Sequence, residues 1–421
     1  MNSNTITGGL PPPLPTIPTI PTTPTLPPLP VLHTMPGSAV AASRAATPHG
    51  LAGACFLLML VAGLVSNGVG WLAGQLKLAD PAPGWRQLMA AEPMQQLAKA
   101  MSDAPLPQAA AALERGLSWL ALRDLGPRVR EGQRDWLFLA DEFTPHAHGQ
   151  VHASERARQV VQVQQGLARQ GIGLLVVVVP DKSRIAAAHL AKQYRPASFA
   201  DRVTDWTRQV AASGVAVIDL SAALAGLQQS SGAAFLRTDS HWTEQGAQVA
   251  AAAVALKLGS LGAVATPVQA VLIAEHQQLP RRGDLLRLAG IDGLPVALQP
   301  AAETVQRSRF VVGPGAVTIK PGHGNDDLFG DADLPTLALI GTSFSRTSQF
   351  APFLEHQLQA KVANFARDGG DFSGAARAYF SSPAFKQTPP KWVIWEIPER
   401  VLAMGRDHDQ LEWTGDKASN P

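Results

Sequence analysis

Two short segments about a hundred residues apart carry the residue types that acyl transfer through serine requires. The first, 237–243 (RTDSHWT), places the carboxylate of Asp239 two positions before the imidazole of His241. The second, 337–345 (LALIGTSFS), has the pattern of a buried strand and a glycine turn that ends at Ser343. A nucleophile, a base and an acid that orients the base suffice for this chemistry, whatever their order along the chain. The two segments therefore predict a Ser-His-Asp site.

Each of these residues also has an ordinary structural interpretation. Ser343 would cap a helix predicted over 349–359, and the loop with Asp239 and His241 would lie at the surface or hold a metal ion. The sequence around His241 shows no repeated His spacing. Cys55 is the single cysteine, which excludes both a cysteine zinc site and an intramolecular disulfide. We therefore expect no metal and no cofactor.

The segments around these motifs alternate between strand and helix patterns. Apolar runs that predict strands occupy 136–139, 173–179, 215–219, 337–340, 361–365 and 392–397. Helical periodicity occupies 154–170 and 247–258, the latter with Thr243 as its N-cap. This alternation predicts an α/β fold with a parallel sheet between helices, while 262–333 is the least regular part and is predicted to be an insertion. Sites in such sheets form at the carboxyl ends of strands, which is where Ser343 falls.

The beginning of the chain differs in composition from the rest. Residues 1–50 contain no Asp or Glu, and a proline recurs every third residue from Pro15 to Pro27, which predicts an extended, disordered segment. Residues 51–76 carry no charge and match the length of a bilayer span, so they predict a transmembrane helix that anchors the chain. A cleaved signal sequence is the alternative. The remaining parts are predicted to be a helical stem over 77–130, the main domain over 131–402 and a tail over 403–421.

The balance of charge excludes one class of partner. The 421 residues include 35 Lys and Arg against 33 Asp and Glu, a formal net charge of +2. A charge so close to zero gives no electrostatic basis for binding nucleic acid.

Taken in order, the motifs resemble those of the alginate O-acetyltransferase group of SGNH-hydrolase-like proteins. The resemblance spans roughly residues 132–402, and no single motif is specific, whereas six in the same order are. Those six segments are 132–138 (GQRDWLF), 179–182 (VPDK), 238–242 (TDSHW), 283–285 (GDL), 341–345 (GTSFS) and 395–400 (WEIPER). The resemblance assigns no clear role to 283–285. The serine follows the Asp and His, which is the reverse of ordinary SGNH hydrolases and agrees with the acetyltransferase branch.

The resemblance implies roles for the three chemical residues. Ser343 would be the nucleophile, His241 the base and Asp239 the acid that orients it. The protein would move an acetyl group through an acyl-serine onto hydroxyls of a bacterial exopolysaccharide, alginate-like or cellulose-like. Its catalytic domain would lie in the periplasm, anchored to the inner membrane, and a membrane-bound O-acyltransferase partner would supply the acetyl group. The chain ends about twenty residues after Arg400, so we expect the membrane-anchored form without a carbohydrate-binding module.

Two further expectations concern the site and its alternatives. Backbone N–H groups near Ser343 and near Gly369 or Gly370, with Asn364, are predicted to hold the oxyanion, because paired glycines permit close backbone approach. Trp242 is predicted to offer a platform for a sugar ring, and Trp395 is a second candidate, although core packing is the favoured role for Trp395. The same triad with water as the acceptor would make an acetylesterase, and a non-catalytic polysaccharide-binding scaffold of a secretion complex is the alternative of another class.

Overall fold

The computed structural model describes residues 48–73, 95, 98–99, 101–232, 234–263, 271–312, 334–405, 409, 411 and 413. Four parts of the predicted organisation lie outside this part of the chain, namely residues 1–47 of the proline-rich segment, 74–76 of the transmembrane helix, 77–94 of the stem and most of the tail. The chain divides into two units, 1–61 and 62–421, and each is described by itself.

Helix α1 (Pro48–Leu72) contains the uncharged run near the N-terminus. Within its 23 residues Gly50–Leu72, a stretch of 18 residues has a mean hydropathy of 1.9. At 1.5 Å per residue Gly50–Leu72 extends for roughly 35 Å, which exceeds the roughly 30 Å hydrocarbon thickness of a bilayer. Among the helices that the structure describes, α1 alone has the length and composition to cross a membrane. The predicted N-terminal apolar helix is therefore confirmed.

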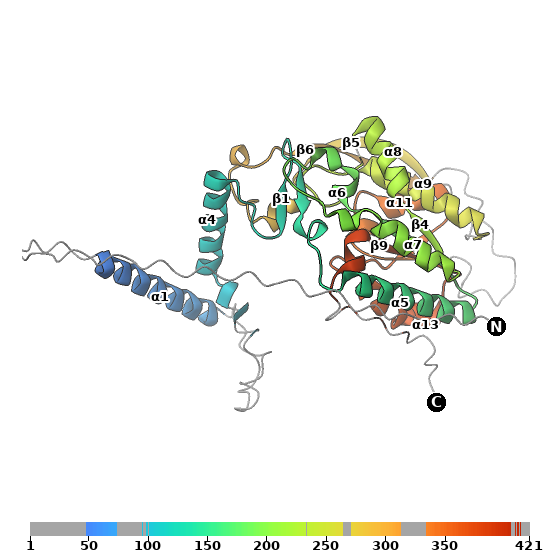
Figure 1. Ribbon diagram of the computed structural model, residues 1–421, viewed down its shortest axis with the longest axis horizontal. Helices are drawn as coiled ribbons and strands as arrows, with labels where there is room; N and C mark the ends of the chain where they lie inside the picture. The colour runs from blue at the N-terminus through green and yellow to red at the C-terminus, as the bar shows by residue number, and fades with distance from the viewer. Residues whose placement is uncertain are drawn as a thin grey trace, which may run out of the picture. The chain divides into compact units, whose positions relative to one another are not determined.

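A sheet of five parallel strands forms the centre of the second unit (Figure 1). Its strand order is β4-β3-β9-β7-β8. The strands are β3 (Gly173–Val179), β4 (Ala216–Asp219), β7 (Leu337–Ile340), β8 (Val362–Asn364) and β9 (Trp392–Pro398). Strands β3, β7 and β9 are almost entirely buried, as their unbroken apolar runs require for strands covered on both faces. This confirms the predicted parallel sheet.

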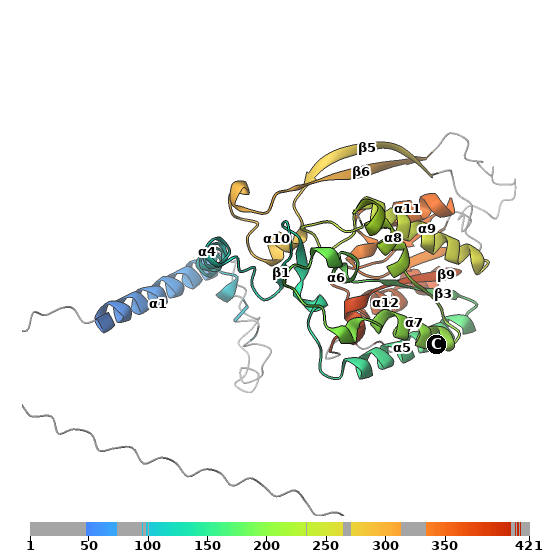
Figure 2. The same ribbon diagram turned by 45° about the horizontal axis from the view of Figure 1, so that its top comes forward.

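Helices cover both faces of the sheet (Figures 1 and 2). Val176 and Val178 of β3 pack with one apolar cluster, and Leu175, Val177 and Val179 pack with the other. The helices of the first cluster are α5 (Gly149–Arg169), α7 (Arg202–Ala212), α12 (Gly374–Phe380) and α13 (Pro383–Gln387). The helices of the second are α6 (Lys182–Ile185), α8 (Ser221–Ser231), α9 (Glu244–Ser260) and α11 (Phe350–Leu358). The alternation of side chains along each strand therefore divides the core into two layers.

The predicted strand over 136–139 does not join the central sheet. Its residues form β2 (Leu137–Leu139), which pairs antiparallel with β1 (Val129–Glu131). The reason is that Leu137 and Leu139 pack in a third apolar cluster, together with Trp119 of α4 (Pro105–Leu122). The Nε1–H of Trp119 also donates to the carbonyl of Leu298 at 2.8 Å. Helix α4, which falls in the predicted stem, is thus packed against the main domain.

The segment predicted to be irregular contains a regular hairpin. Strands β5 (Val271–Arg281) and β6 (Glu303–Val312) pair antiparallel, and the short helix α10 (Asp284–Leu288) lies between them in the chain. Figure 2 shows the hairpin running along the outer side of α8, α9 and α11, and Phe310 contacts Phe353 of α11 edge to face. The sequence of β6 (ETVQRSRFVV) does not predict a strand, because polar and apolar residues do not alternate regularly along it.

Candidate functional site

The turn after β7 places Ser343 at the carboxyl edge of the sheet. Gly341 has φ 156°, and a Cβ on it would lie 2.5–2.9 Å from atoms of Glu396, so only glycine fits there. Thr342 follows in extended conformation and its hydroxyl accepts from the backbone N–H of Phe344. Ser343 then begins a single 3₁₀ turn, Ser343–Ser345. The interpretation of Ser343 as a cap of the next helix is wrong, because α11 begins only at Phe350.

Glu396 lies beneath this turn on the neighbouring strand β9. Its buried carboxylate accepts from the backbone N–H of Thr342 at 2.6 Å, from the Thr342 hydroxyl at 3.0 Å and from the Ser345 hydroxyl at 3.1 Å. Burial raises the pKa of Glu396, although these donors oppose the shift. Glu396 therefore holds the turn that carries Ser343, and the hydroxyl of Ser345 is engaged in a hydrogen bond to it.

The loop with Asp239 and His241 is held on both sides. Thr243 directly follows it and caps α9, as predicted, by accepting from the backbone N–H of Gly246 at 3.0 Å. On the other side Lys182, the first residue of α6, is fully buried and donates through Nζ to three carbonyls, those of Leu137 at 2.5 Å, Arg237 at 2.8 Å and Asp239 at 2.9 Å. Burial lowers the pKa of Lys182 to about 8. The lysine thus ties the loop to the edge of the sheet.

Ser343, His241 and Asp239 form one continuous chain of hydrogen bonds. The Nε2 of His241 lies 2.7 Å from the Oγ of Ser343, and its Nδ1 lies 2.7 Å from the Oδ1 of Asp239. The same Oδ1 accepts from the backbone N–H of His241 at 3.0 Å. With Nδ1–H donating to the carboxylate, Nε2 is left as the atom that can accept the serine proton. The structure brings together all three residues that the sequence singled out.

The second oxygen of Asp239 is neutralised by an arginine from the hairpin. Arg281, at the end of β5, donates to Oδ2 through Nε at 3.1 Å and Nη2 at 2.7 Å, and the backbone N–H of Asp284 lies at 3.3 Å. Burial would raise the pKa of Asp239, but the hydrogen bond to His241 and the charge of Arg281 outweigh burial and hold that pKa well below its usual range. Asp239 is therefore an ionised acceptor at neutral pH.

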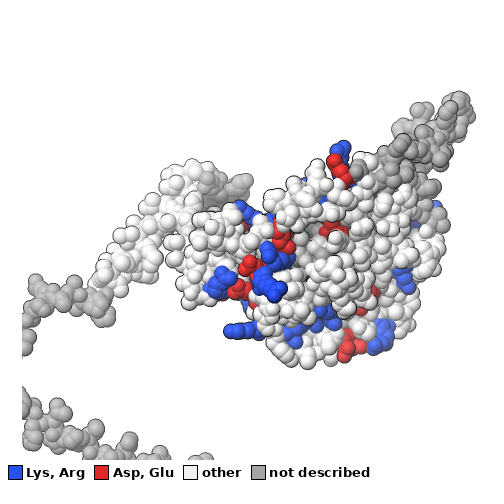
Figure 3. All heavy atoms as spheres, turned by 90° about the horizontal axis from the view of Figure 1, so that it is seen from above, with Lys and Arg blue, Asp and Glu red and all other residues white. Residues whose placement is uncertain are grey.

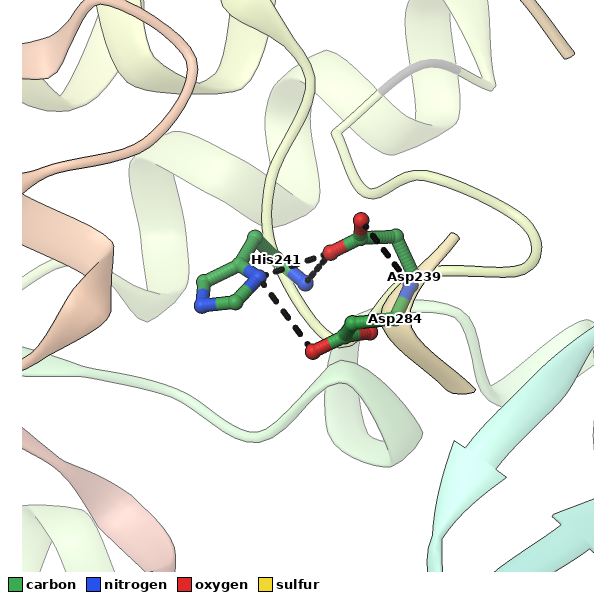
Figure 4. Close-up of side chains that lie close together, drawn as sticks. All are labelled: Asp239, His241 and Asp284. Atoms are coloured by element: carbon green, nitrogen blue, oxygen red, sulfur yellow. Dashed lines mark hydrogen bonds and ion pairs between the residues drawn. The ribbon is translucent and has the colours of Figure 1, made fainter. Parts of the chain in front are cut away.

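Asp239, His241 and Asp284 lie close enough together to raise the question of a metal site. Figure 4 shows the two carboxylates pointing at the same side of the imidazole, toward Nδ1. Both oxygens of Asp239 already accept N–H donors, one of them from the guanidinium of Arg281, and Nδ1 is engaged with Asp239. A cation would have to displace a positive charge, so this donor set fits a hydrogen-bonded relay and not a metal centre.

The sugar platform predicted at Trp242 is wrong, whereas the core packing that was favoured for Trp395 is confirmed. Trp242 and Trp395 have exposed fractions of 0% and 1%. Trp242 packs against Phe344 and Phe350 in the core beneath the site. It supports the ring of Phe344, which also contacts His241 edge to face, and it has no surface to offer a ligand.

Two of the predicted oxyanion groups, Asn364 and Gly370, have hydrogen-bond partners elsewhere. Asn364 donates through Nδ2 to the carbonyl of Ser345 at 2.8 Å and accepts from the backbone N–H of Ala366 at 3.0 Å, so it braces the serine turn. The backbone N–H of Gly370 donates to the carbonyl of Arg367 at 3.2 Å. Gly369 lies in the same turn with φ 65°, and no described hydrogen bond joins it to the serine turn.

One backbone donor does lie at Ser343 itself. Among the hydrogen bonds of the described residues, none uses the N–H of Ser343, which stands at the start of its 3₁₀ turn. Such N-terminal N–H groups are free to stabilise a negative oxygen.

A cleft of about 410 Å³ lies between the hairpin and the loop after Ser343, and its lining includes bonded neighbours of Asp239 and Ser343 but none of Asp239, His241 and Ser343 themselves. Arg281 belongs to one wall, and on the other the backbone N–H of Thr347 donates to the carbonyl of Ser343 at 3.0 Å. The polar side chains that line the cleft include Arg307, Arg346, Gln306, Ser348 and Gln349. On the face drawn in Figure 3, basic and acidic side chains lie close together and form no broad field of one sign.

Several residues of the site were not found from the sequence. Lys182, Asp284 and Glu396 lie inside motifs that the sequence did mark, but nothing in those motifs indicated what each side chain does. Arg281 and Glu303 carried no signal. Glu303, at the start of β6, accepts from the backbone N–H groups of Arg237 and Thr238 at 2.6 and 2.8 Å, so the hairpin supports the loop from two points.

Comparison with known proteins agrees with this geometry. Residues 129–399 match the family model described as "SGNH hydrolase-like domain, acetyltransferase AlgX". The chain is 30% identical over 313 residues to the probable alginate O-acetylase AlgJ of Pseudomonas aeruginosa, covering 73% of this chain and 79% of that protein. It is 34% identical over 290 residues to the protein of the same name from Pseudomonas putida, covering 67% and 72%.

A solved structure shares the fold as well as the sequence. The O-acetyltransferase domain of Pseudomonas putida AlgJ superimposes with a TM-score of 0.57 at 30% identity, over 68% of this chain and 96% of that domain. The resemblance that the motifs predicted is therefore confirmed.

Proposed function

Because the chain belongs to the family of SGNH hydrolase-like acetyltransferases, we propose that it transfers acetyl groups through an ester on Ser343 to hydroxyls of an exopolysaccharide. One observation carries the catalytic part of this proposal. It is the unbroken relay from Asp239 through His241 to Ser343, with 2.7 Å at each side-chain contact. The similar proteins named as alginate O-acetylases support the choice of acetyl as the group and of a polysaccharide as its acceptor.

In the first half-reaction the Oγ of Ser343 attacks the carbonyl carbon of the acetyl donor while Nε2 of His241 takes the hydroxyl proton. The resulting imidazolium is stabilised by ionised Asp239 across the 2.7 Å contact. The negative oxygen of the tetrahedral intermediate accepts from the free N–H of Ser343. When the intermediate collapses, the bond to the leaving group breaks, His241 returns the proton to that group, and acetyl-serine remains.

The second half-reaction repeats these steps with a sugar. A hydroxyl of the polysaccharide gives its proton to Nε2 of His241 and attacks the acetyl carbonyl carbon. Collapse breaks the ester bond to Ser343, whose Oγ recovers the proton from His241. Water in place of the sugar would release acetate, so the outcome depends on which hydroxyl is held at the site.

The cleft between the hairpin and the loop after Ser343 is the proposed site for the acceptor. Its lining includes Arg281, which binds Asp239, and Thr347, whose backbone N–H donates to the carbonyl of Ser343. Its arginines, amides and hydroxyls suit the hydroxyls and carboxylates of an alginate-like polymer, because guanidinium groups bind carboxylates with two N–H donors.

An activated acetyl ester and a panel of exopolysaccharide oligomers test the proposal. The wild-type protein should form acetyl-Ser343, visible by mass spectrometry of the trapped intermediate, and should acetylate the oligomers while ester hydrolysis falls. Ser343→Ala should do neither. Failure to acetylate any oligomer, combined with acetate release from pre-acetylated oligomers, would establish an esterase instead. Full activity of Ser343→Ala would end the serine mechanism.

The apolar helix α1 supports the proposed location. We place the chain in the inner membrane with its catalytic domain in the periplasm, where a membrane-bound O-acyltransferase would supply the acetyl group. A reporter enzyme that works only in the periplasm, fused after Arg400, should be active and should sediment with membranes. A shortened soluble chain would show that the helix is a cleaved signal, and an inactive reporter would contradict the location.

A further inference from the structure

The Gly-Asp-Leu motif, which the proposed reaction does not use, lies against the loop that carries the acid and the base. A Cβ on Gly283 would lie 1.9 Å from the carbonyl oxygen of Thr238 and 2.5 Å from the backbone nitrogen of Asp239. The backbone N–H of Leu285 donates to that same carbonyl at 3.3 Å. The backbones of the two segments are therefore in direct contact.

This contact brings a second carboxylate to the histidine. Asp284 accepts from the backbone N–H of Ser240 at 2.7 Å and from its hydroxyl at 2.6 Å. Its Oδ2 then lies 3.7 Å from Nδ1 of His241 (Figure 4). The Oγ of Ser240 lies 3.3 Å from the same nitrogen, so the serine bridges the carboxylate and the imidazole.

A positive charge opposes this second carboxylate. Arg281, three residues before Asp284, binds the far oxygen of Asp239 with two N–H groups. Asp284 favours the imidazolium form of His241, whereas Arg281 disfavours it by neutralising Asp239. One short segment, 281–284, thus sets a positive charge against Asp239 and a negative charge beside the imidazole of His241.

We infer that Arg281 and Asp284 are positioning residues that set, in opposite directions, the pH at which His241 becomes able to accept the serine proton. The inference rests on the proposed serine mechanism. Other charged groups face this loop from the surrounding elements and are the same in every variant considered. They are Lys182 from α6, Glu303 from β6 and Arg400 next to the ring of Phe344.

The pH profile of kcat/KM for a small activated acetyl ester tests the inference, because such an ester does not require the acceptor cleft. Asp284→Asn keeps an oxygen for Ser240 but removes the charge, so neutral His241 should persist to lower pH. Its acidic limb should move down by roughly one pH unit. Arg281→Gln removes the positive charge, so the acidic limb should move up by a similar amount.

Two further variants control for general damage. Arg281→Lys keeps the charge and should return the acidic limb toward the wild-type position, even where kcat stays reduced by the loss of the two-pronged contact. Arg309→Gln removes an arginine of the same hairpin whose side chain is exposed and paired with Glu275, and its profile should match wild type.

The outcomes separate the inference from the mechanism on which it rests. Opposite shifts in Asp284→Asn and Arg281→Gln support the inference. Folded variants whose acidic limbs coincide with wild type, while Ser343→Ala is inactive, overturn the inference and leave the mechanism intact. If Asp284→Asn fails to fold, the comparison of Arg281→Gln with Arg281→Lys decides the question. Acidic limbs at the same pH in these two variants would overturn the inference. An active Ser343→Ala overturns both.

Discussion

Replacement of Gly283 by alanine tests how tightly the structure fixes the acid and base of the triad. Gly283 has φ −73° and ψ 159°, a conformation that any residue adopts, so the backbone itself does not require glycine. The requirement is one of space, because the added methyl would lie 1.9 Å from the carbonyl oxygen of Thr238. That neighbour is backbone, so no rotamer change can relieve the overlap.

The size of the displacement follows from contact distances. A carbon and a carbonyl oxygen approach to about 3.3 Å, so the two segments must separate by about 1.4 Å. The displaced backbone belongs to Thr238 and Asp239, and the 2.7 Å contact from Asp239 to His241 would be stretched or turned. A misplacement of about 1 Å near a reacting group costs on the order of 10²-fold in rate. Overpacking of this kind also costs about 1–3 kcal/mol of stability.

The assay measures kcat/KM for an activated acetyl ester together with the unfolding free energy in urea. Gly283→Ala should lose about two orders of magnitude in kcat/KM, mostly in kcat, while remaining folded. Gly226→Ala is the matched control, since Gly226 lies inside α8 and a Cβ there meets nothing within 4 Å. It should keep full activity and gain about 0.5–1 kcal/mol of stability, because alanine restricts the unfolded chain.

The reasoning fails if Gly283→Ala turns over the ester at the wild-type rate. That result would mean that the segment moves away without carrying Asp239 with it, and that the contacts of Asp284 and Arg281 do not hold the loop. A rate that falls only in proportion to the folded fraction would likewise assign Gly283 to stability and not to the site.

Three further predictions follow from the contacts of the site. The double variant Ser343→Ala, His241→Ala should be little slower than Ser343→Ala alone, since members of a triad act as a unit; additive losses in kcat would contradict the relay. Burial lowers the pKa of Lys182 to about 8 in the folded protein, against about 10.4 in the unfolded chain. The unfolded chain therefore binds more protons between these values, and the wild-type unfolding free energy should rise by on the order of 3 kcal/mol from pH 8 to 10.5. Urea titrations of Lys182→Met should lack this rise, and a parallel rise in the variant would refute it. Glu396→Gln turns an N–H toward the donors of Thr342 and should lose about 1–3 kcal/mol in a urea titration together with much of kcat, whereas Glu275→Gln on the exposed part of the hairpin should change neither; equal behaviour of the two would contradict the role of Glu396.

The sequence was sufficient to predict the elements in which all side chains are buried alike. Strands β3 and β7 were predicted to the residue, because a strand buried on both faces is an unbroken apolar run. The triad was predicted for a related reason. Ser343 follows such a strand, and His241 lies just before a capped helix, so both had recognisable neighbours.

The hairpin and its contacts were beyond prediction from the sequence. Neither face of β6 is uniformly polar or apolar, so no period of two appears. The contact of Arg281 with Asp239 spans 42 residues, and nothing in a single sequence indicates which arginine meets which carboxylate over such a separation. The engagement of Gly370 could not be predicted for a different reason, because its N–H bonds to the carbonyl of Arg367 within a turn that has no sequence signature.

The motifs that the sequence marked without explaining share one structural role. Three of them each contribute a charged residue to one of the two loops that must meet: Lys182 and Asp284 bind the loop of His241, and Glu396 binds the turn of Ser343. Burying charged groups is costly and seldom stabilises a fold on balance. Lys182 and Glu396 are nonetheless fully buried, and each makes three or more hydrogen bonds to loop atoms. Their benefit must therefore lie in geometry, since a relay of two 2.7 Å contacts between separate loops tolerates little movement of either.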